Sequence, residues 1–510
     1  MQHLASSPSD GSVVVDRNSM KFLLHAQIDQ RSIGAHLGAS EYSYFFLLRA
    51  FSGALAELGE VVQLESPAEA DAIHAQCLAV GERCVLLSFA PPHKTPLGLA
   101  CPTIPVFAWE YPDIPQQIEE ECWLDDPRHD WRYVLSRTGR AITLSSHTVE
   151  AVQHSMGTSF PIVAIPSPIK PTTHGSEHGH VPAASQGVLL KVNASVADSR
   201  CMGLDVDGLI YLDEEDETVF LPGDLDDLPE PTRAQSSMAD VQVPDLPDEF
   251  ADADGSAPLI CGWELPPAKP IRTRLHGVIY TAVLAPAAGR KNWEDLITAF
   301  CWTFRDTADA TLVLKLTGTH LARAHIQLLM LLTKLAPFKC RVIAINGYLP
   351  DEDYAALVTA TTYYVNTSLC EGLCLPLVEF LGEGVPAIAP DNTAMADYVD
   401  DSLAFVVASY PGVPTVWPHG DNEVNRTSYH QLDWQSLVDA YRRSFEVAQH
   451  DPHRYRQMSR RAREAIQAYC GHEVVKSRLH AFLRPDLPLS DKPPASPASD
   501  PSSQPLPVAS

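Results

Sequence analysis

Residues 366–399 read NTSLCEGLCLPLVEFLGEGVPAIAPDNTAMADYV and alternate between polar loops and short apolar runs. The preceding TYYV is typical of a buried strand, PLVEFLGEG of a helix and VPAIAP of a second strand. A strand, a helix and another strand in this order predict a parallel sheet with a crossover helix. Seven residues separate two glutamates, Glu371 and Glu379. We expect Glu371 on the loop at the carboxyl end of the first strand and Glu379 about one turn into the helix.

The same alternation extends outward from this stretch in both directions. Upstream, GVIYTAVLA, ATLVLKL and RVIAING are typical of strands, and KNWEDLITAFCWTFRD and HLARAHIQLLMLLTKL of helices. A second series begins at KFLLHAQI, near the amino end of the chain, and closes at PIVAIPSPI. We therefore predict an α/β protein with two Rossmann-like domains, residues 20–170 and 258–440, that face each other across a cleft.

The remaining segments differ in composition from these two domains. Residues 1–19 and the Pro/Ser-rich residues 485–510 are predicted to be disordered tails, and residues 441–484 to form closing helices. Residues 171–257 hold 19 Asp and Glu against three Lys and Arg. We expect an acidic insert or linker there, partly disordered, in which GVLLKVNA and GLIYLDEEDETVFLP could form a hairpin or a small sheet.

Composition excludes several classes of function. The formal net charge of −27 argues against nucleic-acid binding, which needs basic patches. The sequence has neither an apolar run of membrane-spanning length nor the features of a signal peptide. We expect a soluble cytoplasmic protein, and the Arg clusters of the closing helices leave open a peripheral contact with the inner face of the membrane, although core packing is the simpler use of these helices.

Metal sites are not predicted from the cysteine pattern. Eleven cysteines occur without a CxxC pair, and we expect buried thiols in a reducing compartment. Cys370 and Cys374 are the closest pair, but no further ligand lies at zinc spacing. DVDG at residues 205–208 lacks the other oxygens of a calcium loop and is interpreted as a chance match.

The loop around Glu371 is suited to an anionic ligand. Gly372 permits close approach of the backbone, and the N–H groups of Gly372, Leu373 and Cys374 precede a predicted helix. A simpler interpretation also fits: the helix dipole favours Glu371, and Glu379 lies on a solvated helix face.

The surrounding residues favour the first interpretation. EGLCLPLVE closely resembles the E-x7-E motif of the group 1 glycosyl transferases of glycosyltransferase family four, retaining enzymes of GT-B fold. GRKNWEDLITAF, at residues 289–300, resembles the basic loop and helix of the same family. The resemblance is strong over residues 275–405, weaker over 20–170 and absent from the acidic segment.

The resemblance implies a role for each matching position. Glu371 would lie near the donor sugar and bind its hydroxyls, and Glu379 would hold the ribose of the nucleotide. Arg290 and Lys291 would neutralise the diphosphate that leaves as the sugar transfers. Such enzymes need no metal or other cofactor for this step.

The sequence departs from the family at two places. Many members carry an arginine about six residues before the loop lysine, but position 285 here is Ala. Either Arg290 or Lys315, at the end of the strand ATLVLKL, would supply the second charge; alternatively, Lys315 extends to water. The second departure is the glycine loop, for which Gly34 or Gly38 in SIGAHLGASEY is a weak match and a plain turn is the alternative.

In the amino-terminal domain, one acid follows an apolar strand. Glu110 comes directly after PVFAW. We expect it either to face the cleft as a site residue or to form a salt bridge on the rim.

These features predict a retaining glycosyltransferase that moves a hexose from a nucleotide-diphosphate sugar to a glycan or a lipid-linked saccharide, in polysaccharide or glycoconjugate biosynthesis. The alternative is a catalytically inactive GT-B scaffold that binds glycan or protein partners. A phosphorolytic enzyme on the same fold is a more distant option.

Overall fold

The computed structural model describes most of the two predicted domains. The described residues are 20–28, 42–116, 125–169, 188–201, 270–318, 321–416 and 426–483. The predicted glycine loop with Gly38, both predicted tails and most of the acidic segment lie outside them.

The amino-terminal domain contains a six-stranded parallel sheet of order β2-β1-β3-β4-β5-β6. Its strands are β1 (Met20–Ala26), β2 (Glu60–Gln63), β3 (Arg83–Phe89), β4 (Thr103–Phe107), β5 (Ala141–Thr143) and β6 (Ile162–Ala164). Its helices are α1 (Tyr42–Ala56), α2 (Ala70–Val80), α3 (Trp131–Thr138) and α4 (Ser146–Met156). Apolar strands such as β3 and β4 are buried almost throughout, as expected for a parallel sheet covered by helices.

The carboxyl-terminal domain contains a seven-stranded sheet of order β15-β14-β13-β10-β11-β12-β8. Its parallel strands are β10 (Val278–Leu284), β11 (Ala310–Leu316), β12 (Arg341–Asn346), β13 (Tyr363–Val365), β14 (Ala387–Ala389) and β15 (Ala404–Val406). The helices between them are α5 (Trp293–Thr303), α6 (Leu321–Leu335), α7 (Asp351–Ala360) and α8 (Leu375–Gly382). The strand order reverses between β10 and β13, which is the point where open parallel sheets bind ligands.

Part of the predicted acidic insert belongs to this second domain. β7 (Val188–Asn193) pairs antiparallel with β9 (Pro270–Leu275), and β8 (Ser195–Asp198) pairs antiparallel with β12 at the edge of the large sheet. Asp198 accepts hydrogen bonds from the buried guanidinium of Arg341, at 3.0 Å from its Nε. The short run GVLLKVNA therefore pairs with a strand after the acidic segment; GLIYLDEEDETVFLP lies outside the described residues.

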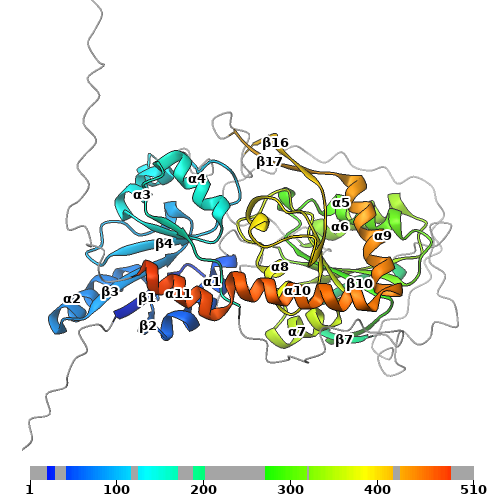
Figure 1. The fold of residues 1–510 in the computed structure, drawn as a ribbon, viewed down its shortest axis with the longest axis horizontal. Helices are drawn as coiled ribbons and strands as arrows, with labels where there is room; N and C mark the ends of the chain where they lie inside the picture. Colours follow the sequence, from blue (N-terminus) through cyan, green and yellow to red (C-terminus); the bar gives the residue numbers. More distant parts are fainter. Residues whose placement is uncertain are drawn as a thin grey trace, which may run out of the picture.

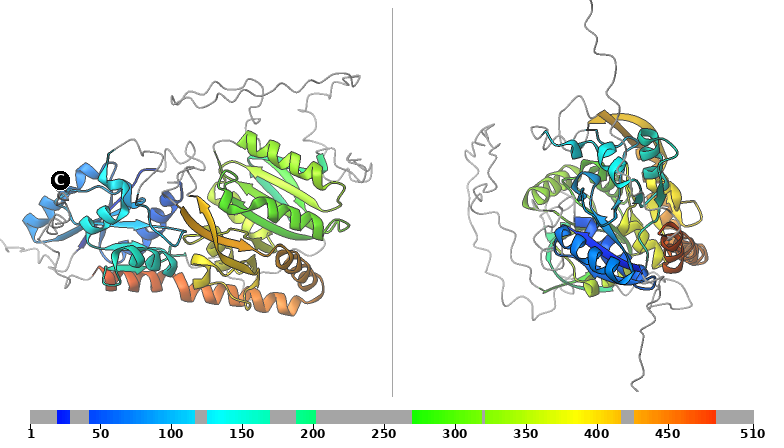
Figure 2. Two further views of the ribbon diagram at one scale, coloured as in Figure 1. Left: turned by 90° about the horizontal axis from the view of Figure 1, so that it is seen from above. Right: turned by 90° about the vertical axis from the view of Figure 1, so that its left-hand side faces the viewer.

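The closing helices connect the two domains. α9 (Trp434–His450) follows the hairpin of β16 (Ser409–Val416) and β17 (Arg426–Leu432), and α10 (Pro452–Cys470) runs from the second domain toward the first. α11 (His472–Phe482) lies against α1 of the amino-terminal domain (Figure 1; Figure 2, left). Their apolar faces are buried in the core, as the simpler interpretation of these helices expects. Among the described residues, no helix combines the length and the apolar character needed to cross a membrane.

The structure confirms the predicted fold class, two Rossmann-like α/β domains in the arrangement of the GT-B fold. The carboxyl ends of their strands meet, because the loop after β4 contacts the loops after β10 and β13. This meeting place contains several of the residues singled out from the sequence.

Candidate active site

Two loops leave the carboxyl-terminal sheet at its switch point. β10 leads into a short 3-10 helix, Gly289–Lys291, and β13 leads into the loop that carries Glu371. The two strands pair in parallel, with Tyr280 opposite Tyr363. Their loops therefore emerge side by side, and residues that are about 80 positions apart in the sequence meet.

Glu371 binds both basic residues of the first loop. Its Oε2 lies 2.9 Å from a terminal nitrogen of Arg290, and its Oε1 accepts a hydrogen bond from the Lys291 ammonium. The hydroxyl of Ser368 donates to the same Oε1 at 2.6 Å. Glu371 is only 3% exposed. It is therefore a buried, fully engaged carboxylate, and the helix dipole alone does not account for its position.

The surrounding cations keep Glu371 ionised. Burial would raise the pKa of this carboxyl, but the charges of Lys291 and Arg290 outweigh it and hold the pKa at about 2. The guanidinium of Arg290 responds in the opposite direction: burial lowers its pKa, whereas Glu110 and Glu371 raise it well above the usual value. Both groups therefore carry full charge at neutral pH.

The amino-terminal domain contributes Glu110 to this cluster. Its Oε1 lies 2.8 Å from Nε of Arg290, so that Arg290 joins the acids of both domains. Glu110 follows β4, and its side chain is 18% exposed. The structure thus places Glu110 inward, at the meeting of the domains, and in a salt bridge at the same time. We call Glu110, Arg290, Lys291 and Glu371 the charge cluster.

Gly372 lies where its loop packs directly against the backbone of the amino-terminal domain. A Cβ at this position would lie 2.8 Å from the backbone nitrogen of Trp109 and 3.0 Å from Cβ of Ala108. No side chain fits that gap without displacing the backbone.

The start of α8 offers unbonded donors. Cys374 lies in the left-handed region at φ 63° and precedes α8 without a side-chain cap. Among the described residues, the N–H groups of Gly372, Leu373 and Cys374 find no hydrogen-bond acceptor. Donors without an acceptor before a helix suit an anion, and the binding of one there stays a prediction. Burial raises the pKa of the Cys374 thiol to about 12, so it is protonated and neutral at physiological pH.

Glu379 lies in a different environment, one turn into α8. The phenol of Tyr354 on α7 donates a hydrogen bond of 2.8 Å to its Oε2. Burial raises the pKa of Glu379 to about 7, although the bond from Tyr354 and the charge of Arg49 act to lower it. Glu379 is partly buried, and the interpretation as a solvated helix residue is wrong. It is not a member of the charge cluster.

Lys315 is a buried cation at the end of β11. It is 4% exposed and has no ion-pair or hydrogen-bond partner among the described residues. It lies beside Val283 of β10 and Ile345 of β12 in the register of the sheet. Burial lowers the pKa of Lys315 to about 8. The structure therefore does not place it in the charge cluster, and a buried, unpartnered ammonium beside the switch point is free to bind an anion.

Three supporting residues were not predicted from the sequence. Ser368 bonds Glu371, Tyr354 bonds Glu379, and the hydroxyl of Thr393 accepts the N–H of Glu371 at 2.9 Å. Ser368 precedes Glu371 by three residues in the same loop, so its position offered a weak signal. Tyr354 and Thr393 come from other elements, and their contacts depend on the tertiary fold.

An open pocket of about 230 Å³ lies between α4 and the segment that follows Glu110 in the amino-terminal domain. His147, in the first turn of α4, lines it, and Nε2 of this imidazole lies 3.0 Å from the carbonyl oxygen of Glu110. Burial lowers the pKa of His147. The other lining residues are Pro112, Asp113, Glu150, Ala151 and His154. Polar side chains thus surround an opening next to Glu110.

Comparisons with known proteins find similarity at the level of structure only. No protein-family model matches the sequence, and no curated protein matches it. A sucrose-phosphate synthase from Thermosynechococcus elongatus is 13% identical, with 91% of this chain and 98% of that chain covered and a TM-score of 0.47.

Two further solved structures are similar. One has UDP bound, and the other is a domain of a glycosyl transferase. HepE from Anabaena, in complex with UDP and glucose, is 10% identical over 91% of this chain and 98% of that chain, with a TM-score of 0.44. The C-terminal domain of a glycosyl transferase group 1 family protein from Francisella tularensis is 16% identical over 39% of this chain and 88% of that one, with a TM-score of 0.29. At these scores the similarity assigns no activity, and the functional argument depends on the charge cluster itself.

Proposed function

We propose that this protein is a retaining glycosyltransferase that moves a hexose from a nucleotide-diphosphate sugar to a glycan or a lipid-linked saccharide. The observation that carries the proposal is the pairing of Arg290 and Lys291 with Glu371 at the switch point, where both domains meet. Two fixed cations at this position match the negative charge of a departing diphosphate.

In the proposed reaction, the bond between the anomeric carbon and the diphosphate oxygen breaks, and the diphosphate leaves with the bonding electrons. A new bond forms between the anomeric carbon and an acceptor hydroxyl, whose proton passes to a phosphate oxygen. Arg290 and Lys291 would lower the barrier by pairing with the diphosphate oxygens on which charge develops. In this proposal Arg290 and Lys291 neutralise the charge of the leaving diphosphate, so the transfer step needs no metal.

Donor binding would rearrange the charge cluster. Arg290 and Lys291 are now neutralised by Glu371 and Glu110, and the diphosphate competes with these carboxylates for the same two cations. Glu371, once released from part of its ion pairs, would accept hydrogen bonds from the sugar hydroxyls. The two domains would remain linked on the far side by α10 and α11.

The neighbouring groups would hold the rest of the donor. Lys315 and the free N–H groups before α8 suit the phosphates, and Glu379 with Tyr354 suits the ribose hydroxyls. The cavity beside Glu110 would take the acceptor. We also propose a role in polysaccharide or glycoconjugate biosynthesis. The protein would act in the cytoplasm, with or without peripheral membrane contact.

The test is calorimetric titration of the full chain with UDP, GDP and ADP and then with their sugar conjugates. We expect at least one nucleoside diphosphate to bind and Lys291→Ala to abolish this binding. Arg442→Ala is the control, because Arg442 is an exposed residue with a surface ion pair. If no nucleoside diphosphate binds to the folded protein, the proposal is wrong.

Two observations favour the catalytically inactive scaffold instead. Both cations are already paired with carboxylates, and position 285 carries Ala in place of the family's arginine. Donor turnover separates the two functions. An active transferase loses its turnover in Glu371→Ala while keeping its fold, whereas a scaffold shows no turnover in the unaltered protein.

A further inference from the structure

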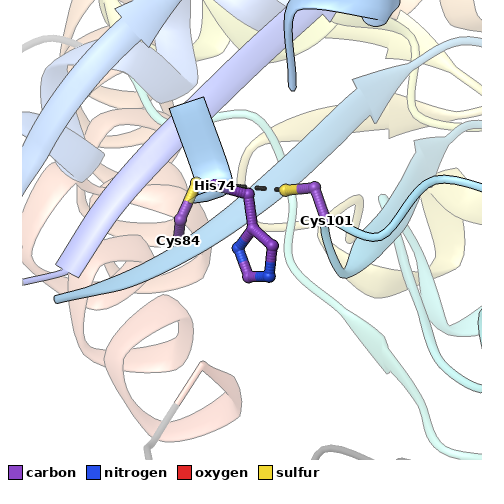
Figure 3. Close-up of side chains that lie close together, drawn as sticks. All are labelled: His74, Cys84 and Cys101. Carbon is purple, nitrogen blue, oxygen red and sulfur yellow. Dashed lines mark hydrogen bonds between the residues drawn. The ribbon is translucent and has the colours of Figure 1, made fainter. Parts of the chain in front are cut away.

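A cluster of sulfur and nitrogen ligands lies in the amino-terminal domain, away from the charge cluster. Its members come from α2 and from the amino ends of β3 and β4, as Figure 3 shows for three of them. Cys84 is the second residue of β3, and Cys101 precedes β4 by two residues. The charge cluster lies at the opposite, carboxyl edge of this sheet, where Glu110 follows β4. From the sequence alone these cysteines are predicted only to be buried thiols.

The register of the sheet brings the two cysteines together. Leu86 of β3 pairs with Thr103 of β4, so Cys84 and Cys101 lie next to each other when the register is extended by two residues. Both thiols are buried, and their sulfurs are 3.9 Å apart. They pack with Leu23, Leu86 and α2 in one apolar cluster, which places them on the sheet face that α2 covers.

His74 on α2 completes a group of three ligands. One imidazole nitrogen and the sulfurs of Cys84 and Cys101 all lie within 4.8 Å of one another. Nδ1 of His74 is buried and has no hydrogen-bond partner. An unsatisfied buried nitrogen costs free energy, and a bound cation would remove that cost.

The spacing matches zinc coordination. Zinc binds thiolate sulfur at about 2.3 Å in tetrahedral geometry, so two sulfurs on one ion lie about 3.8 Å apart. The 3.9 Å between Cys84 and Cys101 fits this value without any movement of the strands.

Cys77 is positioned to supply the fourth ligand. It follows His74 by one helical turn on α2, on the face that lies against the sheet. It is buried in the same apolar cluster as Cys84 and Cys101.

We propose that the amino-terminal domain binds one structural zinc ion through four side chains. These ligands are His74, Cys77, Cys84 and Cys101. Binding converts the three thiols to thiolates and releases their protons, so the apparent affinity rises with pH.

The surroundings support an ordered site. The carboxylate of Asp71 accepts the backbone N–H of Cys101 at 2.9 Å, and Asp71 precedes His74 by one turn of α2. This bond fixes the segment before β4 against the helix that carries two of the ligands. The metal would hold the segment just before β4. The carboxyl end of β4, which leads to Glu110, lies about 20 Å from Cys101 by strand geometry.

A second group of the same size provides a control. Glu57, His472 and Glu473 also bring ligand atoms within 4.8 Å of one another. Lys476 occupies that group, because its ammonium lies 2.7 Å from carboxylate oxygens of both glutamates. We therefore expect no zinc there, and His472→Gln is the matched control for His74→Gln.

The experiment uses the full chain, purified under reducing conditions and freed of metal with a chelator. Zinc and, separately, cobalt(II) are titrated into it. We expect one equivalent of zinc per chain, a higher melting temperature, and cobalt absorption bands typical of tetrahedral thiolate coordination. Absence of stoichiometric zinc binding would overturn the proposal, as would a Cys84–Cys101 disulfide found by mass spectrometry in a separate preparation whose thiols are alkylated at cell lysis without reductant.

Variants then identify the ligands. His74→Gln and Cys101→Ser should each weaken zinc binding by at least 100-fold, as measured by competition with a chromophoric chelator. His472→Gln and Cys201→Ser, which alters an exposed cysteine, should leave it unchanged. Should a ligand variant fail to fold, His74→Cys keeps a zinc ligand at that place and should retain binding with a shifted cobalt spectrum. Unchanged binding in both His74→Gln and Cys101→Ser would show that the metal lies elsewhere.

Discussion

The surroundings of Glu371 and of Glu379 differ sharply, although the two acids belong to one motif on one loop and helix. Burial acts to raise the pKa of both carboxyls. For Glu371 the two adjacent cations reverse that effect and hold the pKa at about 2. For Glu379 the main partner is a neutral phenol, and the pKa rises to about 7. The formal charge of a partner, more than the degree of burial, decides the ionisation of each acid.

This difference assigns two kinds of chemistry to one motif. Glu371 is a permanent anion that balances Arg290 and Lys291. Glu379 changes its protonation near neutral pH, so its hydrogen-bond role with a ligand depends on pH. Variants that exchange or remove these partners test the comparison.

The largest expected effect is on stability, and it should separate the two acids. Glu371→Gln leaves one uncompensated buried positive charge in the charge cluster. We expect the free energy of unfolding to fall by about 3 kcal/mol, the lower end of the range for broken buried ion pairs, because Lys291 keeps some contact with water. Glu379→Gln should instead raise it at pH 7, because Gln stays neutral, whereas a carboxyl with a pKa of about 7 is partly ionised there in a site that disfavours its charge. Chemical denaturation of both variants measures the difference, and equal losses would contradict the comparison.

The pH dependence of stability should have opposite signs for the two acids. The pKa of Glu379 is raised in the folded state, so its contribution is fully present below about pH 4.5 and is lost as the pH rises through about 7. The pKa of Glu371 is lowered, so its contribution is present above about pH 4.5 and is lost as the pH falls toward about 2.

Melting temperatures of the unaltered protein and of Glu379→Gln, measured from about pH 5 to 8, test the first of these statements. The difference in stability between the two proteins should change by at most about 1.4 kcal/mol per pH unit. Parallel curves over this interval would mean that Glu379 does not titrate there.

Lys315 extends the comparison to a cation without a partner. Lys315→Met removes a buried ammonium, so we expect stability to be kept or to rise. If Lys315 binds the phosphates, affinity for a nucleoside diphosphate should fall about tenfold, which corresponds to about 1.4 kcal/mol. Lys339→Met, at an exposed position, is the control in the same calorimetric titration. Unchanged affinity would remove Lys315 from the phosphate site.

The smallest expected effect concerns the phenol beside Glu379. Its hydrogen bond stabilises the charged carboxylate and so lowers the pKa. Tyr354→Phe should raise the pKa of Glu379 further, by less than about one unit, which is the size of one hydrogen bond. The pH at which stability changes should move upward accordingly. Tyr429→Phe serves as the comparison, and a downward movement would mean that Tyr354 does not donate to the carboxylate.

The sequence predicted the two α/β domains because their apolar strands and amphipathic helices repeat with clear periods. The family resemblance implied one donor site for Glu371, Glu379, Arg290 and Lys291. The structure brings Glu371 together with Arg290 and Lys291, whereas Glu379 is bonded to Tyr354 instead. The pairing of β7 with β9, across the acidic segment, was not predicted, because antiparallel partners far apart in sequence leave no local signal.

The sequence predicted only those site residues that lie close to a motif. Tyr354 approaches Glu379 from a different helix, and its role depends on how α7 packs beside α8. The zinc ligands are likewise distributed over a helix and two strands, so no short spacing announced them. For Cys370 and Cys374, the absence of a metal remains a prediction. Among the described residues, neither belongs to a group of three possible ligands.

The packing of α11 on α1 limits where this protein can be divided into fragments. Gly471 forms a bridge with Ile169 just where α10 gives way to α11, so the last described helix completes the first domain. A fragment that ends after the second sheet would lack a wall of the first one. The amino-terminal domain is thus assembled from two segments that are about 300 residues apart in the sequence, and its core cannot close until α11 has been made.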